Sequence, residues 1–339
     1  MLTSPLPSSG ARRYRSLVPI AAGTTFLAAV VIAFANAYWI STFSSVVALA
    51  LACSGIAVLY GQLGLVSLCQ YALLGVGGWV ALRVSHGLHA SFEICLLAGG
   101  LVAAMIGVLW GLPAFRLRGL YLAVVTLMLA GTFQVVISAS GFPDGGPGFF
   151  GRADAAQRQL MARPRIAEGD RAYLAYAFAV LLLGLILVEL HRRSVPGRAW
   201  ALIRRSETGA LAAGVNIAFY KAWAFALSGF LAGIGGGLLA GAVGQLDGRA
   251  FTAADSILVF ALTVVGGAYD WFGPIIAGLL LRAVPSLLTD FAVNGYIALV
   301  IFGVALLHAL VTAPVGIAGQ LSAVAARFSA RLGRAGRRA

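Results

Sequence analysis

Long apolar runs recur along most of this 339-residue chain and constrain its fold more than any other feature. Several of them reach about twenty residues, the length at which an α-helix crosses a bilayer ~30 Å thick. Hydrophobic residues make up 60% of the sequence and charged residues only 10%, whereas a soluble domain carries roughly 25% charged residues. The sequence therefore predicts an all-α polytopic membrane protein.

The apolar runs differ in length, and this sets the expected number of spans. Those at 257–268 and 272–281 are so short that re-entrant or interrupted helices are expected there. The run at 17–37 contains Ala35-Asn36-Ala37, which a signal peptidase accepts, but it exceeds the apolar part of a usual signal peptide. We therefore expect eight to ten transmembrane helices. Full spans are predicted over 17–37, 39–60, 63–82, 92–112, 119–138, 172–190, 221–244 and 295–312.

The basic residues predict the orientation of these spans. The chain has 24 Lys and Arg against 11 acids, a net charge of +13. Threading it with the N-terminus inside places a basic tail (1–16), a basic loop (191–221) and a second basic tail (321–339) in the cytoplasm. The periplasmic loop (139–171) then carries bases and acids together, as the positive-inside rule requires. We expect a transmembrane domain over 17–320 with both termini cytoplasmic, and a lipid bilayer but no nucleic acid as partner.

The loop 191–221 is the longest polar stretch in which charges of one sign dominate. Only Gly209 disfavours a helix between Arg198 and Ala213. Trp200, Ile203 and Leu211 recur at roughly three- or four-residue intervals, which predicts a short surface helix with a narrow apolar stripe. Such a helix could dock against a soluble partner, or the loop could simply be a basic loop that obeys the positive-inside rule.

Polar side chains are unusually frequent in the third predicted span. It contains Ser67, Gln70 and Tyr71 together with several glycines, which permit either close helix packing or a helix break that lines a pathway. The glycines of the span 221–244 have no polar companions, so packing is expected there. Arg282, inside a short apolar segment, is expected to reach an interface.

No catalytic, cofactor or metal site is indicated. The chain has no phosphate-binding loop, no H-E-x-x-H and no G-x-S-x-G, and its four histidines are scattered. Cys53, Cys69 and Cys95 have no metal spacing and are expected to be small buried residues. If this protein transports a solute against a gradient, the energy must come from a partner.

The loop and three other stretches together resemble one family. GRAWALIRRSETGALAAGVNIAFYKAWAF (197–225) is similar to the cytoplasmic loop of the M-type permease subunit of branched-chain amino acid and urea-type ABC importers. FRLRGLYLAVVTL (115–127), the GGPG turn (145–148) and SILVFALTVVGGAYDWFGPIIAG (256–278) resemble the same family. The likeness covers about 55–319. Cys69 departs from a usual Gly, Ser206 from a usual Asn, and Asp144 from a usual Thr or Ser.

The resemblance implies that 199–212 is a coupling helix that docks on a separate ATP-binding subunit. Gly214 would end or turn this helix, and polar residues would contact the partner or lock the loop. The expected coupling residues are Arg198, Ile203, Arg204, Glu207, Gly214 and Lys221. The expected pathway residues are Ser67, Gln70, Tyr71 and Thr126. The implied partners are a second permease subunit (a heterodimer), two ATP-binding subunits and a periplasmic solute-binding protein, in the cell inner membrane.

Two other function classes are weaker. A secondary transporter would need intramembrane carboxylates, and Asp255 and Asp290 lie at span ends. A membrane enzyme would need a catalytic cluster. The substrate stays open among branched-chain amino acids, urea or amides, and aromatic acids.

Overall fold

The computed structural model describes residues 17–117, 119–140, 160–247, 250–290 and 316–324, and the single positions 297, 300, 303, 304 and 307. Within these ranges the chain is helical and has no strand. The long helices are α2 (Leu17–Phe34), α3 (Ala37–Ile56), α4 (Gln70–Leu88), α5 (Phe92–Gly111), α6 (Leu120–Ser140), α7 (Asp170–Arg193) and α10 (Ile217–Val243). The short ones are the π-helical η1 (Ala57–Leu63), the 3₁₀ turn η2 (Leu112–Phe115), α8 (Val195–Arg205), α9 (Glu207–Ala212), α11 (Ala253–Gly266), α12 (Gly273–Gly278), the π-helical η4 (Leu279–Ala283) and α13 (Val284–Asp290).

The predicted all-α membrane fold is confirmed. Six helical segments of the described chain are long and apolar enough to cross a bilayer: Leu17–Phe34, Ala37–Leu63, Phe92–Phe115, Leu120–Ile137, Asp170–Arg193 and Ile217–Val243. Two shorter apolar helices, Ala253–Gly266 and Gly273–Leu288, follow where interrupted helices were expected. Most of three predicted segments lies outside the described residues: the span 295–312, the loop 139–171 and the tail 321–339. The N-terminal tail 1–16 and Asp144 also lie outside them.

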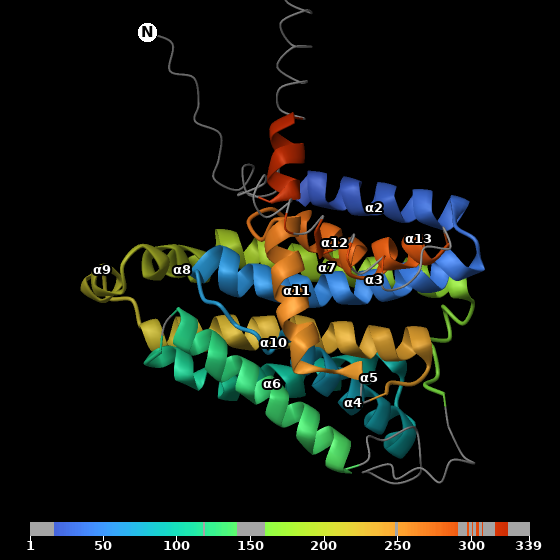
Figure 1. The fold of residues 1–339 in the computed structure, drawn as a ribbon, viewed down its shortest axis with the longest axis horizontal. Coiled ribbons are helices and arrows are strands. Elements are labelled where there is room, and N and C mark those ends of the chain that lie inside the picture. The colour runs from blue at the N-terminus through green and yellow to red at the C-terminus, as the bar shows by residue number, and fades with distance from the viewer. Residues whose placement is uncertain are drawn as a thin grey trace, which may run out of the picture.

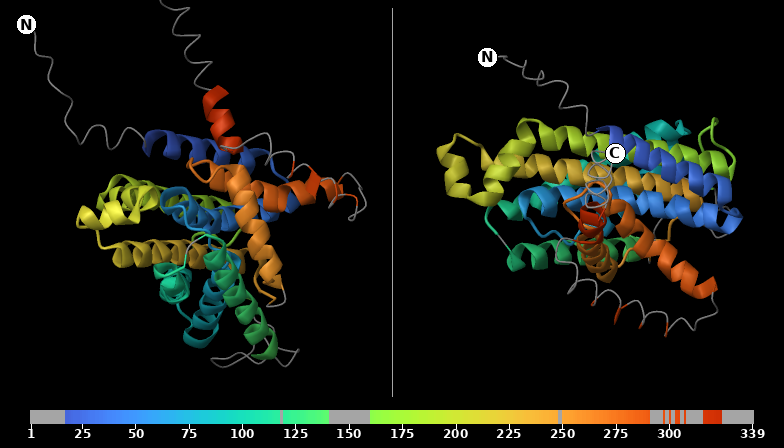
Figure 2. Two further views of the ribbon diagram at one scale, coloured as in Figure 1. Left: turned by 60° about the vertical axis from the view of Figure 1, so that its left-hand side comes forward. Right: turned by 90° about the horizontal axis from the view of Figure 1, so that it is seen from above.

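Helix α10 forms the centre of the bundle, and α3, α4 and α5 pack along it (Figure 1). Small residues bring these backbones close together: a Cβ on Gly233 would lie 2.5 Å from the carbonyl oxygen of Gly99, and one on Gly236 would overlap the carbonyl oxygen of Leu74. The packing role expected for the glycines of α10 is therefore confirmed. On the periphery, α2 packs mainly on α7, and α11 runs across the long helices instead of along them (Figures 1 and 2).

The predicted third span begins later than expected. Helix α3 continues through η1 to Leu63, and Gly64 then adopts a left-handed conformation (φ 72°) that ends the helix. Residues 64–69 are not helical, although Leu65, Ser67 and Cys69 are buried, and α4 starts only at Gln70. Non-helical backbone is tolerated inside a membrane protein only where protein or a cavity surrounds it. We call residues 64–69 the interrupted segment.

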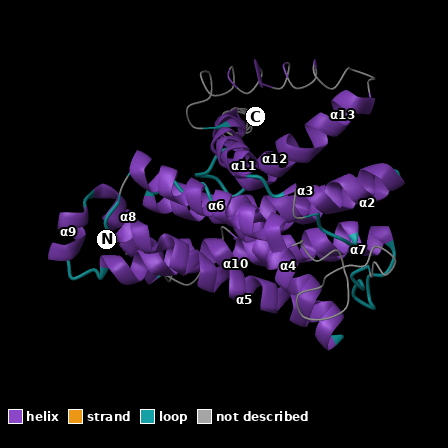
Figure 3. Ribbon diagram, turned by 60° about the horizontal axis from the view of Figure 1, so that its bottom comes forward, coloured by secondary structure: helices purple, strands orange, loops and turns teal. Residues whose placement is uncertain are grey.

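Helices α8 and α9 project beyond one end of the bundle (Figures 1 and 3). Helix α7 leads into them and α10 returns from them, so the predicted basic loop is anchored by two long helices. Polar side chains start the elements here: Asn216 caps α10 by accepting a hydrogen bond from Phe219 N (3.1 Å). The end of the bundle that carries α8 and α9 is called the loop end below.

Substituting Gly236 by Ala tests the packing of α10. The new Cβ would overlap the carbonyl of Leu74, so we expect the free energy of unfolding to fall by about 1–3 kcal/mol. The matched control is Gly131→Ala on α6, where nothing lies within 4 Å of the new Cβ. There the better helix propensity of Ala leaves stability unchanged or raises it by about 0.5–1 kcal/mol. Thermal unfolding in detergent compares the two, and equal melting temperatures would contradict the packing.

Candidate functional site

The predicted single helix over 199–212 is wrong, because Ser206 divides it. Ser206 has an extended backbone (φ −163°, ψ 120°), and its hydroxyl accepts a hydrogen bond from Gly209 N at 3.1 Å. Ser206 is thus the N-cap of α9, while Gly209, the expected helix breaker, lies inside α9. Asn and Ser are both favoured N-caps, so Ser206 preserves the capping chemistry of the Asn that the resembling family usually has there.

The break also changes which apolar residues face the bundle. Trp200 and Ile203, the latter expected as a coupling residue, are buried, and Trp200 Nε1 donates to the carbonyl of Tyr220 at 2.9 Å. Leu211, expected on the same stripe, is instead 61% exposed, and Ala210 takes the buried position on α9. Because the helix is interrupted at Ser206, the buried side of α9 is not the continuation of the buried side of α8. Trp200 and Ile203 therefore anchor α8 to the bundle.

Lys221, the chain's single lysine, is completely buried and holds three elements together. Its Nζ donates to the carbonyl of Ala114 at 2.8 Å and pairs with the Glu207 carboxylate at 2.9 Å. These contacts join α10, the connection η2 and α9. Two roles were open for Glu207, a contact with the partner or a lock on the loop, and its pairing with Lys221 is the contact of a residue that locks the loop. Lys221, expected as a coupling residue, is itself buried in this lock.

Arg204 also turns toward the bundle. Its Nη1 donates to the carbonyl of Gly61 at 2.6 Å, its Nη2 donates to Tyr269 Oη at 3.2 Å, and its guanidinium lies 5.1 Å from the centroid of the Tyr269 ring. Tyr269 belongs to the turn between α11 and α12, which we call the inner turn (267–272). Gly61 is one of the glycines around the start of the third predicted span, whereas Tyr269 lies in the stretch 256–278 without a sequence signal of its own.

A different set of residues faces away from the bundle. The spacing of Arg198, Leu202 and Arg205 places them on one side of α8, and all three are exposed. Thr208 and Leu211 are exposed on α9. We call these five residues the outer face. Gly214 follows α9 with φ 76°, the left-handed conformation expected of a residue that ends a helix there.

Three of the four expected pathway residues stabilise the interrupted segment and its surroundings. Gln70 is fully buried, and its Nε2 donates to the carbonyls of Ala52 (3.1 Å) and Ser228 (3.0 Å). Thr126 accepts a hydrogen bond from Leu68 N at 2.9 Å, and Ser67 Oγ lies 3.2 Å from Cys69 Sγ. The polar atoms of these three side chains thus contact protein groups in and around the interrupted segment.

Tyr71 differs from the other three because it is only half-buried. Its ring packs against Phe251 with centroids 5.3 Å apart, next to the start of α11. Arg282, expected to reach an interface, is exposed on η4. Tyr71 is therefore the expected pathway residue whose side chain is accessible in this structure.

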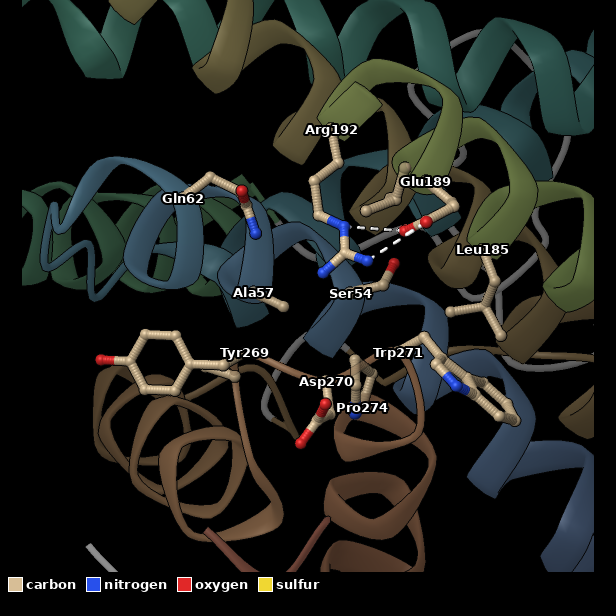
Figure 4. Close-up of a pocket in the computed structure, with 12 residues that line it drawn as sticks. Ser54, Ala57, Gln62, Leu185, Glu189, Arg192, Tyr269, Asp270, Trp271 and Pro274 are labelled. Atoms are coloured by element: carbon tan, nitrogen blue, oxygen red, sulfur yellow. Dashed lines mark hydrogen bonds and ion pairs between the residues drawn. The ribbon is translucent and has the colours of Figure 1, made fainter. Parts of the chain in front are cut away.

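A small gap lies behind the loop end, between η1, the last turn of α7 and the inner turn (Figure 4). Gln62, Ser54 and Arg192 border it, and Arg192 pairs with the buried Glu189 carboxylate at 2.8 Å. Its volume of about 30 Å³ suits one or two water molecules. The gap is too small for a solute of amino-acid size.

Among the residues that the structure describes, no cluster of His, Cys, Asp or Glu could hold a metal ion. Cys53, Cys69 and Cys95 are free and buried, as expected. Among the described residues, the polar groups considered as a functional site are therefore those at the loop end and at the interrupted segment.

Comparison with known proteins gives consistent matches. Residues 39–310 match a family model described as branched-chain amino acid transport system, permease component. The high-affinity branched-chain amino acid transport system permease proteins LivM of Escherichia coli K12 and Salmonella typhimurium LT2 are each 31% identical over 272 residues. That match covers 75% of this chain and 64% of either relative, so the chain spans just under two thirds of their length. No solved structure matches.

The Lys221–Glu207 pair predicts a specific stability pattern. Glu207→Leu would leave a buried ammonium without its counter-charge, a change that costs roughly 3–5 kcal/mol. We expect the α9 amides to lose hydrogen-exchange protection, and the double variant Glu207→Leu/Lys221→Met to regain much of it. Arg205→Leu, a neighbouring exposed charge, is the control and should change protection little. Unchanged exchange in Glu207→Leu would refute the lock.

Proposed function

The chain belongs to the family of branched-chain amino acid transport system permease components, and on this premise we propose that it is the transmembrane permease subunit of an ABC importer. It is a multi-pass protein of the inner membrane, and its helices form part of the translocation pathway. Separate subunits hydrolyse ATP and drive transport through α8 and α9. The observation that carries this proposal is the loop end, where two short helices are held against the bundle by buried contacts and present an exposed outer face.

The construction of the loop end supports a docking role over a passive basic loop. A loop that served only topology would need charge but no fixed shape. Here Trp200, Ile203 and the Lys221–Glu207 pair fix α8 and α9 against the bundle. The outer face then combines two arginines with two exposed leucines, a mixture of charged and apolar groups that suits a protein partner. A rigid mount of this kind can transmit the closure of an ATPase dimer as a rigid-body movement.

The proposed partners follow from the family. They are two ATP-binding subunits, a second permease subunit that makes a heterodimer, and a periplasmic solute-binding protein. The named substrate of the two relatives is a branched-chain amino acid, and we propose the same class here, with urea or amides and aromatic acids as alternatives. Tyr71 is the proposed pathway contact, while Ser67, Gln70 and Thr126 shape the interrupted segment beside it.

The alternative of an ion-coupled secondary transporter finds little support in the acids that would have to carry it. Asp255 is engaged in the cap of α11, where Thr252 Oγ1 donates to its carboxylate at 2.6 Å. Asp290 is exposed at the end of α13. Neither lies free within the bundle, where an ion-coupling carboxylate is needed.

Reversing one charge of the outer face tests the docking. Arg205→Glu should weaken association with the ATP-binding subunits about tenfold, equivalent to ~1.4 kcal/mol, and should reduce ATP-driven uptake into proteoliposomes. Arg171→Glu is the matched control, because Arg171 is exposed at the start of α7, at the opposite end from α8. Co-purification measures the association. Equal retention of the ATPase by both variants would count against docking at α8 and α9.

Tyr71 tests the pathway. Tyr71→Ala should raise the solute concentration needed for half-maximal uptake severalfold while the ATP-binding subunits stay bound. Tyr71→Phe keeps the ring contact with Phe251 and should change this concentration less. Uptake assays with branched-chain amino acids, urea and an aromatic acid would also rank the substrate classes. Unaltered uptake in Tyr71→Ala would remove Tyr71 from the pathway.

A further inference from the structure

We propose that Arg204 is a positioning residue that transmits movement of α8 to η1 and the inner turn. The two neighbouring arginines then have different roles: Arg205 contacts the ATPase, and Arg204 transmits the movement that the ATPase causes. The inference rests on the proposed function, since it names the residue through which docking would act on the bundle. It is drawn from the contacts of one side chain with two segments that lie far from it in sequence.

The guanidinium of Arg204 connects three elements. From α8 it donates to the carbonyl of Gly61 in η1, 2.6 Å away, and to Tyr269 Oη in the inner turn, 3.2 Å away. It also lies over the Tyr269 ring, 5.1 Å from the centroid, within the range of a cation–π interaction. Hydrogen bonds from a charged donor are roughly twice as strong as neutral ones. A displacement of α8 therefore pulls on both segments through one rigid planar group.

The end of η1 is built to receive this donor. Gly64 N donates to the carbonyl of Tyr60, and Leu65 N donates to that of Leu59, which closes the helix. The Gly61 carbonyl lies in the last turn, where helix carbonyls lack a partner within the helix. Arg204 supplies the donor. The arginine stem passes next to Gly64, where a built Cβ would make an ordinary van der Waals contact with Arg204 Cγ at 3.5 Å.

The two receiving segments touch each other, so they move together. A Cβ on Gly61 would overlap the carbonyl oxygen of Ala268, which means that the backbone of η1 lies directly against the inner turn. Tyr269 packs on Tyr60 with centroids 6.2 Å apart, and Tyr60 meets Phe260 of α11 edge-on at 5.4 Å. Movement passed to Gly61 and Tyr269 therefore reaches α11, the helix that crosses the bundle.

A small gap next to η1 leaves room for a small displacement. Gln62 borders the small gap shared with Arg192 and the inner turn (Figure 4). Protein interiors are close-packed and resist small shifts, so a water-sized gap beside η1 removes packing that would otherwise hold it in place. Helix η1 is thus linked to α8 through Arg204 and borders a water-sized gap at Gln62.

Arg205 supplies the contrast. It follows Arg204 in the chain, carries the same charge and is exposed like Arg204, but no hydrogen bond or ion pair links it to the described residues. Arg204→Met keeps a stem of similar length and removes every donor. Arg205→Met makes the same change on the outer face. The two variants form a matched pair.

The test uses the assembled transporter in proteoliposomes: the full chain with its second permease, ATP-binding subunits and solute-binding protein. Retention of the ATP-binding subunits, ATP hydrolysis and solute uptake are measured on the same preparations. We expect Arg204→Met to retain the ATPase within twofold of wild type, while uptake per ATP hydrolysed falls about tenfold. Arg205→Met should instead weaken ATPase retention and leave uptake per ATP hydrolysed close to wild type.

Conservative variants separate transmission from simple structural support. Arg204→Lys has a charge but cannot reach Gly61 and Tyr269 together, so we expect intermediate uptake per ATP. Tyr269→Phe removes only the hydroxyl acceptor and should lower the solute uptake per ATP hydrolysed less than Arg204→Met does. If Arg204→Met does not fold, Tyr269→Ala, which removes the ring and hydroxyl that Arg204 contacts, provides the same readout.

Two results would overturn the inference. Arg204→Met could lose the ATPase as strongly as Arg205→Met, which would make Arg204 a docking contact. It could also keep uptake per ATP at the wild-type value, which would show that movement reaches η1 by another route. A wild-type chain that binds no ATPase would refute the proposed function itself, before any variant is compared.

Discussion

Backbone polar groups buried in a membrane protein need partners, since each unpaired one costs several kcal/mol in the absence of water. Regular helices satisfy this requirement for most of the chain. Where the helix between α3 and α4 is interrupted, side chains supply partners to backbone groups: Thr126 accepts from Leu68 N, and Arg204 donates to the carbonyl of Gly61. These polar side chains therefore support the interruption.

This requirement explains why polar residues gather at two places in an otherwise apolar chain. One is the interrupted segment, where the chain gives up helical hydrogen bonds just before the half-buried Tyr71. The other is the loop end, where Lys221 joins α9, α10 and η2. Arg204 joins the two, because it leaves from α8 and ends on the carbonyl of Gly61. The proposed docking site and the proposed pathway are thus parts of one hydrogen-bonded structure.

The basic residues of the loop end have distinct environments although they share a charge. Lys221 is buried and paired, Arg204 bridges α8 to the bundle, and Arg198 and Arg205 are exposed. A basic loop needs only net charge to set topology, so this division indicates a more specific use. The proposed use is to fix α8 and α9 firmly and leave one face for the ATPase.

The sequence by itself determined what depends on composition and local pattern: the helical membrane class, the positions of most spans, the short apolar segments after 253, the basic loop and the family. Burial of ~20 apolar residues in a bilayer is a local property of each segment, so it can be predicted without knowing which helices pack against that segment.

The tertiary structure decided the rest. Ser206 divides the loop helix, Leu211 faces outward, and Glu207 pairs with Lys221 instead of pointing to solvent. It also showed that Gln70 and Thr126 bind backbone groups, and that Arg204 meets a carbonyl 143 residues away. A buried polar side chain in the sequence indicates only that it needs a hydrogen-bond partner. Which group becomes that partner depends on which helices pack together in the tertiary structure.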